Sequence, residues 1–295
     1  MSRSTVVTHN RVSLAVHEVD PGDPDAARPL LLLHGLGERT PRTTPGSVEW
    51  PGPVIGLDFT GHGDSTVPVG GGYTSEILVG DVDAVLEHLA EPVTILGRGL
   101  GAYIALLSAA ARPDVVRGAV LADGPGVAGG GVHPGSRALV VPNAPSGAPD
   151  PYALMELARD VRPADYARTF AGFAVEASDL DVPIWVSAVV RPAWLEAIID
   201  ARRRTGPGVA RVGDLRGCRV RLTGPTRPAQ VGRGQAGTGG SDNPASIVWI
   251  ASLISSVEFS GSTSSPSCCP NRSTDAMPWV QVQRVIAVSS GSRSG

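Results

Sequence analysis

Three closely spaced glycines separate an apolar run from a helical pattern in the middle of the chain. Residues 93–96 (Val-Thr-Ile-Leu) are apolar enough for a buried strand, and residues 103–111 have the composition of a helix. The sequence between them includes Gly97, Gly99 and Gly101, and glycine permits the sharp turn that so short a connection needs. A strand that passes into a helix in this way predicts an α/β protein with a mostly parallel sheet.

Other segments of the first 122 residues fit the same architecture. Residues 5–19 alternate apolar and polar positions around His9-Asn10, which predicts an opening hairpin. Residues 74–90 carry apolar side chains at helical spacing, with acidic side chains on the opposite face. Continuous apolar runs predict further buried strands at residues 30–33, 54–57 and 119–122. This order predicts a mostly parallel central sheet with flanking helices.

The chain changes character twice after this series. Residues 124–150 are rich in Gly and Pro, and residues 151–201 regain helical composition, with a strand-like segment at 183–186. We therefore expect an α/β core over residues 1–204, with a helical cap inserted at about 130–195. Residues 205–295 are rich in Ser and Gly and poor in acidic residues. For them we expect an irregular tail, which reflects either a shifted reading frame or poor order.

Charge and composition argue against several kinds of partner. A formal net charge of -3 and a pI near 6.1 give no basic field for nucleic acid or for an anionic membrane. No apolar run is long enough to span a bilayer and the N-terminus has no secretory pattern, so a cytoplasmic protein is expected. Cys218, Cys268 and Cys269 fit neither a disulfide framework nor a metal-ligand spacing. We expect no metal and no cofactor.

Three motifs in a fixed order resemble the α/β-hydrolase fold family. They are His34-Gly35, the segment 58–65 (Asp-Phe-Thr-Gly-His-Gly-Asp-Ser), and Gly97-x-Gly99-x-Gly101. The resemblance covers about residues 5–200 and is closest to capped esterases, lipases and epoxide hydrolases. It implies an eight-stranded, mostly parallel sheet, a cap over a pocket, and hydrolysis of an ester or a related small apolar substrate.

The third motif resembles a nucleophile elbow in which the nucleophile is missing. In the pattern Gly-x-Ser-x-Gly the serine occupies a strained strand-to-helix turn, and here that position is Gly99. The resemblance also implies an oxyanion hole formed by the backbone N–H groups of Leu36 and Leu100. His34, Gly35 and Arg98 are expected to line the same pocket.

The second motif is expected to be structural. In the family this loop is stabilised by its own aspartate and histidine, which take no part in the reaction. The residues assigned to this structural loop are Asp58, Gly61, His62, Gly63 and Ser65.

The general base is missing as well as the nucleophile. The family's triad runs serine, acid, histidine along the chain, but no histidine follows His133. Asp123 ends a predicted strand where some relatives keep the acid, but without an imidazole to orient, it fits a strand-end turn residue better. Ser108 and Cys218 are poorly placed as substitutes for the serine. We expect a hydrolase by descent with impaired catalysis.

Two other functions remain open from the sequence. One is a binding module on the same fold, which would hold a small apolar molecule or ester without turnover. The other is a Rossmann-like dinucleotide-binding protein, because Gly97-x-Gly99-x-x-Ala102 matches that fingerprint and Asp123 ends the next strand. Against it, two central strands come first, and Arg98 is bulky beside a pyrophosphate.

Overall fold

An eight-stranded sheet forms the centre of the molecule. The structure is a computed structural model that describes residues 3–131, 147–178, 180–204, 212–214, 220–222 and 257–259. The strand order is β1-β2-β4-β3-β5-β6-β7-β8. The strands are β1 (Ser4–His9), β2 (Val12–Asp20), β3 (Leu30–Leu33), β4 (Val54–Leu57), β5 (Val93–Arg98), β6 (Val116–Ala122), β7 (Ile184–Ser187) and β8 (Val212–Asp214).

The sheet is parallel from β4 to β8 and antiparallel only at its N-terminal edge. β1 pairs antiparallel with β2, and β2 pairs antiparallel with β4. Asn10 has a φ of 55° in the tight turn between β1 and β2, a conformation that asparagine tolerates better than most residues. All the remaining pairs are parallel. The predicted fold class and opening hairpin are confirmed.

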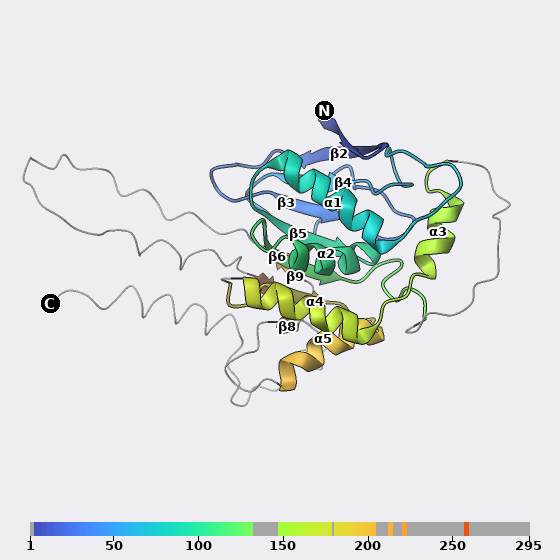
Figure 1. The fold of residues 1–295 in the computed structure, drawn as a ribbon. Helices are drawn as coiled ribbons and strands as arrows, with labels where there is room; N and C mark the ends of the chain where they lie inside the picture. The colour runs from blue at the N-terminus through green and yellow to red at the C-terminus, as the bar shows by residue number, and fades with distance from the viewer. Residues whose placement is uncertain are drawn as a thin grey trace, which may run out of the picture.

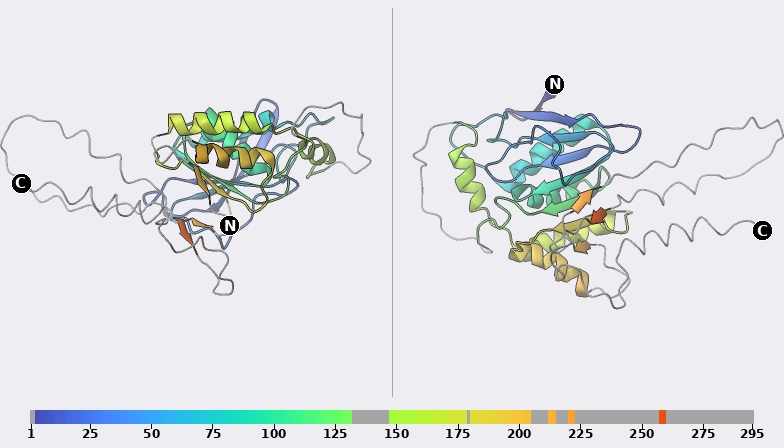
Figure 2. Two further views of the ribbon diagram at one scale, coloured as in Figure 1. Left: turned by 90° about the horizontal axis from the view of Figure 1, so that it is seen from below. Right: turned by 180° about the vertical axis from the view of Figure 1, so that it is seen from behind.

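Helices cover one face of this sheet (Figure 1). They are α1 (Ser75–Leu89), α2 (Leu100–Ala111), α4 (Ala164–Ala177) and α5 (Ala193–Arg204), and α2 packs against β5, β6 and α4. The view from behind in Figure 2 shows the strands in front of these helices. In β3, Leu31 and Leu33 belong to the core on the helical face, whereas Leu30 and Leu32 pack with Trp50 on the other face. A strand buried on both faces explains the uninterrupted leucine run.

Part of the range from about 130 to 195, where a cap was expected, belongs to the core. Within that range β7 pairs parallel with β6, and α4 packs against α2 and α5, so both belong to the core. The described helix between β6 and α4 is α3 (Pro151–Ala158), which lies to one side of the other helices (Figure 1). Sequence composition did not separate core helices from cap helices because both bury an apolar face.

The tail is described only in three short strands. β8 completes the main sheet, and β9 (Val220–Leu222) pairs antiparallel with β10 (Val257–Phe259) in a separate two-stranded sheet. The rest of residues 205–295 lies outside the described residues, so the expectation of an irregular tail stays a prediction.

Candidate functional site

The strand-to-helix turn lies at Gly99, between the end of β5 and the start of α2. Gly99 has φ 60° and ψ -117°, a conformation that residues with a β-carbon adopt only under strain. The next glycine along the motif is equally constrained, because a β-carbon on Gly101 would lie 2.4 Å from the carbonyl oxygen of Leu33. The spacing of the glycines is thus imposed by close backbone packing.

The space in front of Gly99 is filled by the segment that follows β6. A β-carbon added to Gly99 would lie 2.1 Å from the carbonyl oxygen of Pro125 and 2.6 Å from the carbonyl carbon of Gly124. A β-carbon does not come this close to an atom to which it is not bonded. A serine at position 99 would therefore require the backbone at 124–125 to move.

The two backbone donors assigned to an oxyanion hole both bind that same oxygen. The N–H of Leu36 donates to the carbonyl oxygen of Pro125 at 3.0 Å, and the N–H of Leu100 donates to it at 2.9 Å. We call these two groups the donor pair. Their convergence on one oxygen is the geometry that an oxyanion hole requires, with Pro125 supplying the oxygen.

His34 is held as a neutral ring whose two nitrogens are both engaged. Nε2 accepts a hydrogen bond from the N–H of Phe59 at 3.1 Å, so Nδ1 carries the proton and donates to the carbonyl of Gly35 at 2.8 Å. Burial, reinforced by repulsion from His62, lowers the pKa of His34 to about 4. A ring in this state has no free nitrogen with which to accept a proton from a nucleophile.

Arg98 and Gly35 are joined through Glu38. One carboxylate oxygen of Glu38 pairs with the guanidinium of Arg98, and the other accepts the N–H of Gly35 at 3.0 Å. The side chain of Arg98 is half exposed, so this bridge lies at the surface. It links the loop that follows β3 to the turn at Gly99.

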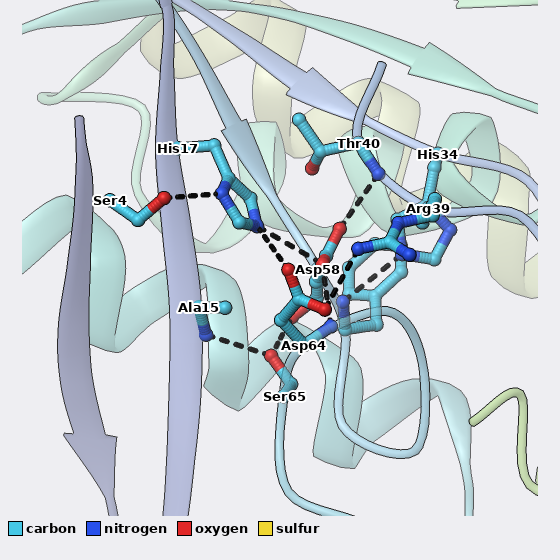
Figure 3. Close-up of polar contacts among 10 residues, drawn as sticks. Ser4, Ala15, His17, His34, Arg39, Thr40, Asp58, Asp64 and Ser65 are labelled. Atoms are coloured by element: carbon cyan, nitrogen blue, oxygen red, sulfur yellow. Dashed lines mark hydrogen bonds and ion pairs between the residues drawn. The ribbon is translucent and has the colours of Figure 1, made fainter. Parts of the chain in front are cut away.

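Asp58 anchors the loop that follows β4 (Figure 3). Its carboxylate accepts hydrogen bonds from the backbone N–H groups of Thr40 at 2.7 Å and Asp64 at 2.8 Å, and contacts Nε2 of His17 at 3.1 Å. Burial alone would raise the pKa of Asp58, but these hydrogen bonds outweigh it and the pKa is lowered. The hydroxyl of Ser65 donates to the carbonyl of Asp58, which closes the loop.

The remaining loop residues explain the spacing of the motif. Gly61 and Gly63 have φ of 80° and 54°, and a β-carbon on Gly63 would lie 1.9 Å from the Asp58 carboxylate. His62 is buried with Nδ1 3.2 Å from the carbonyl oxygen of Thr60, and burial lowers the pKa of its ring. These contacts are the kind expected of a structural loop.

Ser4, His17 and Asp58 lie in a hydrogen-bonded line, as Figure 3 shows. They are the residue types of a catalytic triad, but Ser4 lies on the exposed edge strand and Asp58 is already bound by backbone donors. The nearby Asp64 completes a set of potential metal ligands with His17 and Asp58. Asp64 instead pairs with Arg39 at 2.8 Å, so each of these side chains has a structural partner.

The carboxylate of Asp123 binds the backbone that follows β7. Its two carboxylate oxygens accept the N–H groups of Val189 at 2.5 Å and Val190 at 3.0 Å. This ties the end of β6 to the segment after β7, the role of a strand-end residue. The same contacts occupy the carboxylate that a dinucleotide ribose would need, and Pro125 occupies the Leu100 N–H at the start of α2.

The comparisons agree with this architecture. The model of a family described as "Alpha/beta hydrolase family" matches residues 30–250, well over half of the chain. The chain therefore belongs to the alpha/beta hydrolase family. Among curated proteins none matches.

Solved structures with similar folds include known hydrolases. A thioesterase domain from the curacin biosynthetic pathway is 20% identical (TM-score 0.35; 41% of this chain and 44% of that one). An epoxide hydrolase from Vigna radiata is 22% identical (TM-score 0.33; 41% and 40%). A membrane phospholipase A, a bacterial virulence factor, is 19% identical (TM-score 0.43; 72% and 77%). The chain spans about two fifths of the length of the first two, and TM-scores this low carry no functional argument.

Two residues of the site were missed by sequence reasoning. Pro125 lies in a Gly- and Pro-rich stretch that gave no sign of docking against Leu36 and Leu100. Arg162, which binds the carbonyls after Pro125, precedes Pro163 at the start of α4 and looks like an ordinary surface arginine in the sequence.

Within the described residues, no helix is both long and apolar enough to cross a membrane. The cellular compartment stays a prediction.

Proposed function

We propose that this member of the alpha/beta hydrolase family does not hydrolyse esters. The observation that carries the proposal is the position of Pro125, whose carbonyl oxygen fills the space where a side chain on Gly99 would lie. The same oxygen takes both hydrogen bonds of the donor pair. A substrate carbonyl has neither a nucleophile to react with nor free donors to bind.

The chemistry of the triad supports the same conclusion. Ester hydrolysis by this family needs a nucleophile activated by a general base, and each is worth several orders of magnitude in rate. Gly99 has no side chain, and the sequence has no histidine after His133. His34 cannot replace the base, because its two ring nitrogens are engaged.

An esterase assay with a covalent probe tests this directly. The full chain is incubated with p-nitrophenyl acetate and p-nitrophenyl butyrate, and separately with a fluorophosphonate that labels activated serines. We expect no turnover above the buffer rate and no label. Saturable turnover that survives repurification and that one substitution abolishes would overturn the proposal.

The variant Gly99→Ser tests whether activity is absent only because residue 99 has no hydroxyl group, or also because the base and the space for a substrate are absent. A serine alone restores the motif but neither the base nor the space, so we expect this variant to remain inactive and unlabelled. Turnover by Gly99→Ser would show that a base exists after all.

A second candidate function is binding without turnover, of a small molecule that presents one acceptor oxygen. The convergence of Leu36 N–H and Leu100 N–H on a single oxygen favours it, since a ligand oxygen that displaced the carbonyl of Pro125 would meet the same two donors. The candidate ligand is a small apolar carboxylate or ester, as the resemblance suggests. Chemical-shift changes at these two amides on addition of sodium butyrate would detect it.

A further inference from the structure

Residues 124–127 form a tight turn, called here the 124–127 turn, that meets the donor pair. We propose that the 124–127 turn is an internal ligand of the donor pair, and that Arg162 is the positioning residue that keeps it there. A small molecule with an acceptor oxygen would then bind only in competition with this turn. The inference rests on the proposed function, since it explains why the site is closed.

The sequence of the turn dictates where its carbonyl points. The N–H of Val127 donates to the carbonyl of Gly124 at 3.3 Å, and Gly126 has a φ of 77°. Proline at the second position and a positive φ at the third are the features of a type II turn. In this turn type the central peptide is flipped relative to type I, which directs the carbonyl of Pro125 to the outside, toward the donor pair.

Close packing holds the turn against the loop that carries Leu36. A β-carbon on Gly126 would lie 2.7 Å from the β-carbon of Leu36, and one on Gly35 would lie 2.9 Å from Cδ of Pro125. Glycines therefore permit the approach from both sides. The 124–127 turn and the loop that carries Leu36 therefore pack closely, although they lie about 90 residues apart in the sequence.

Arg162 fixes the turn from behind. Its Nη1 donates to the carbonyls of Gly126 and Val127, and Nε1 of Trp194 donates to the Val127 carbonyl at 2.8 Å. The guanidinium lies 4.8 Å from the ring centroid of Tyr103. These contacts bind the carbonyls of the last two residues of the turn, whereas the donor pair binds the carbonyl of Pro125.

The charge of Arg162 makes this contact strong. Only 2% of the residue is exposed, and Nε and Nη2 have no hydrogen-bond partner among the described residues. Burial lowers the pKa of Arg162 to about 10, which still leaves it protonated at neutral pH. A buried cation needs acceptors, and hydrogen bonds to a charged donor are stronger than neutral ones. Movement of the turn would remove the acceptors that this cation has.

The wild-type protein provides the first test. Couplings across hydrogen bonds, measured by NMR on deuterated protein, would link the backbone ¹⁵N of Leu36 and Leu100 to the carbonyl ¹³C of Pro125. We expect both couplings to the one carbon. If neither is present while couplings within β3 and β5 are seen, the internal ligand does not exist.

The variant Arg162→Met tests the positioning role, because it keeps the length of the side chain and removes its donors. We expect the amides of Leu36 and Leu100 to exchange with solvent roughly tenfold faster or more, while Leu31 and Ile95 in the sheet keep their rates. Arg168→Met is the matched control, since Arg168 lies exposed on α4 and pairs with Asp165. Unchanged exchange at the donor pair in Arg162→Met would overturn the role of Arg162.

A second variant covers the case in which Arg162→Met fails to fold. Trp194→Phe removes the Nε1–H donor to Val127, along with part of the indole ring, and keeps an aromatic ring against Tyr103, 5.1 Å away between centroids in the wild type. We expect faster exchange at Leu36 and Leu100, by a smaller factor than for Arg162→Met. Equal acceleration across the whole sheet would instead mean general loosening and would overturn the proposal.

Sodium butyrate serves as the competing ligand. We expect it to shift the amide resonances of Leu36 and Leu100 in Arg162→Met at lower concentration than in the wild type, with no ester turnover in either. Equal affinity in both proteins would overturn the competition. Ester turnover by the wild type together with intact couplings to Pro125 would overturn the proposed function and leave the internal ligand standing.

Discussion

The carbonyl oxygen of Pro125 lies 2.1 Å from the point where a β-carbon on Gly99 would stand. Glycine is required at position 99 because the 124–127 turn occupies the space that a side chain on residue 99 would fill. The glycine at position 99 and the position of the Pro125 carbonyl are one structural feature. A single change back to serine would restore the motif without restoring the space.

Gly99→Ala is expected to destabilise the fold. The variant places a β-carbon in a strained backbone conformation, at a cost of roughly 1–3 kcal/mol, and displaces the backbone at Pro125 in addition. Urea unfolding followed by circular dichroism would measure a lower free energy of unfolding.

Gly172→Ala is the matched control for this prediction. Gly172 lies inside α4, and a β-carbon there would meet nothing within 4 Å. Alanine should therefore stabilise the helix by about 0.5–1 kcal/mol. If Gly99→Ala stabilised the protein as Gly172→Ala is expected to do, the inferred crowding at Gly99 would be contradicted.

Asp58→Asn is expected to destabilise the protein by roughly 2–4 kcal/mol. The Asp58 carboxylate binds the N–H groups of Thr40 and Asp64 and the ring of His17. The NH₂ group of asparagine is a donor and would face one of these donors without an acceptor between them. Chemical denaturation would measure the loss.

The comparison for Asp58 is Asp64→Asn in the same loop. The Asp64 side chain is 58% exposed and pairs with an equally exposed Arg39, so its loss should cost less than about 1 kcal/mol. A cost at Asp64 as large as that at Asp58 would argue that the cluster, and not the buried carboxylate, holds the loop.

The order of strands and helices was predictable because its signals are local. The leucine run of β3 and the apolar spacing of α1 each depend on burial within a single element, and both lie where the sequence predicted them. The division between cap and core was less predictable, for a different reason. α4 and β7 could have faced a pocket or a sheet, and only their packing against α2 and β6 decides between the two.

The closed site was not predictable from the sequence for a related reason. The pair Pro125-Gly126 predicts a turn, and the motif around Gly99 predicts a tight connection. The docking of one against the other is a tertiary contact between segments that neither pattern reports. Arg162 adds a second such contact, because nothing local marks it as buried.

Because of His34, the free energy of unfolding should decrease as the pH is lowered from 6.5 to about 4. The ordinary histidine pKa is 6.5 and burial lowers that of folded His34 to about 4. As pH falls, the unfolded chain takes up this proton first, so the contribution is complete above pH 6.5 and lost as pH approaches 4. The full change is about 3 kcal/mol. Urea titrations at several pH values would measure it.

The variant His34→Gln isolates this contribution. His62 has a lowered pKa and acts in the same direction, whereas Asp81 has a raised pKa and gains relative stability as pH falls. Both groups remain in the variant, so the difference between the two proteins reports His34 together with its repulsion from His62. The variant should show a shallower slope between pH 6.5 and 4, and identical slopes would contradict a buried neutral ring.

The dinucleotide alternative predicts binding that the site geometry opposes. A dinucleotide would need the N–H groups at the start of α2 for its pyrophosphate and a free acid at the end of β6 for its ribose. Leu100 N–H is bound to Pro125, and both oxygens of Asp123 are bound to Val189 and Val190. Neither NAD nor NADP at millimolar concentration should raise the melting temperature of the chain. A concentration-dependent rise that Asp123→Asn removes would show that the Gly97-x-Gly99-x-x-Ala102 turn opens to a phosphate after all.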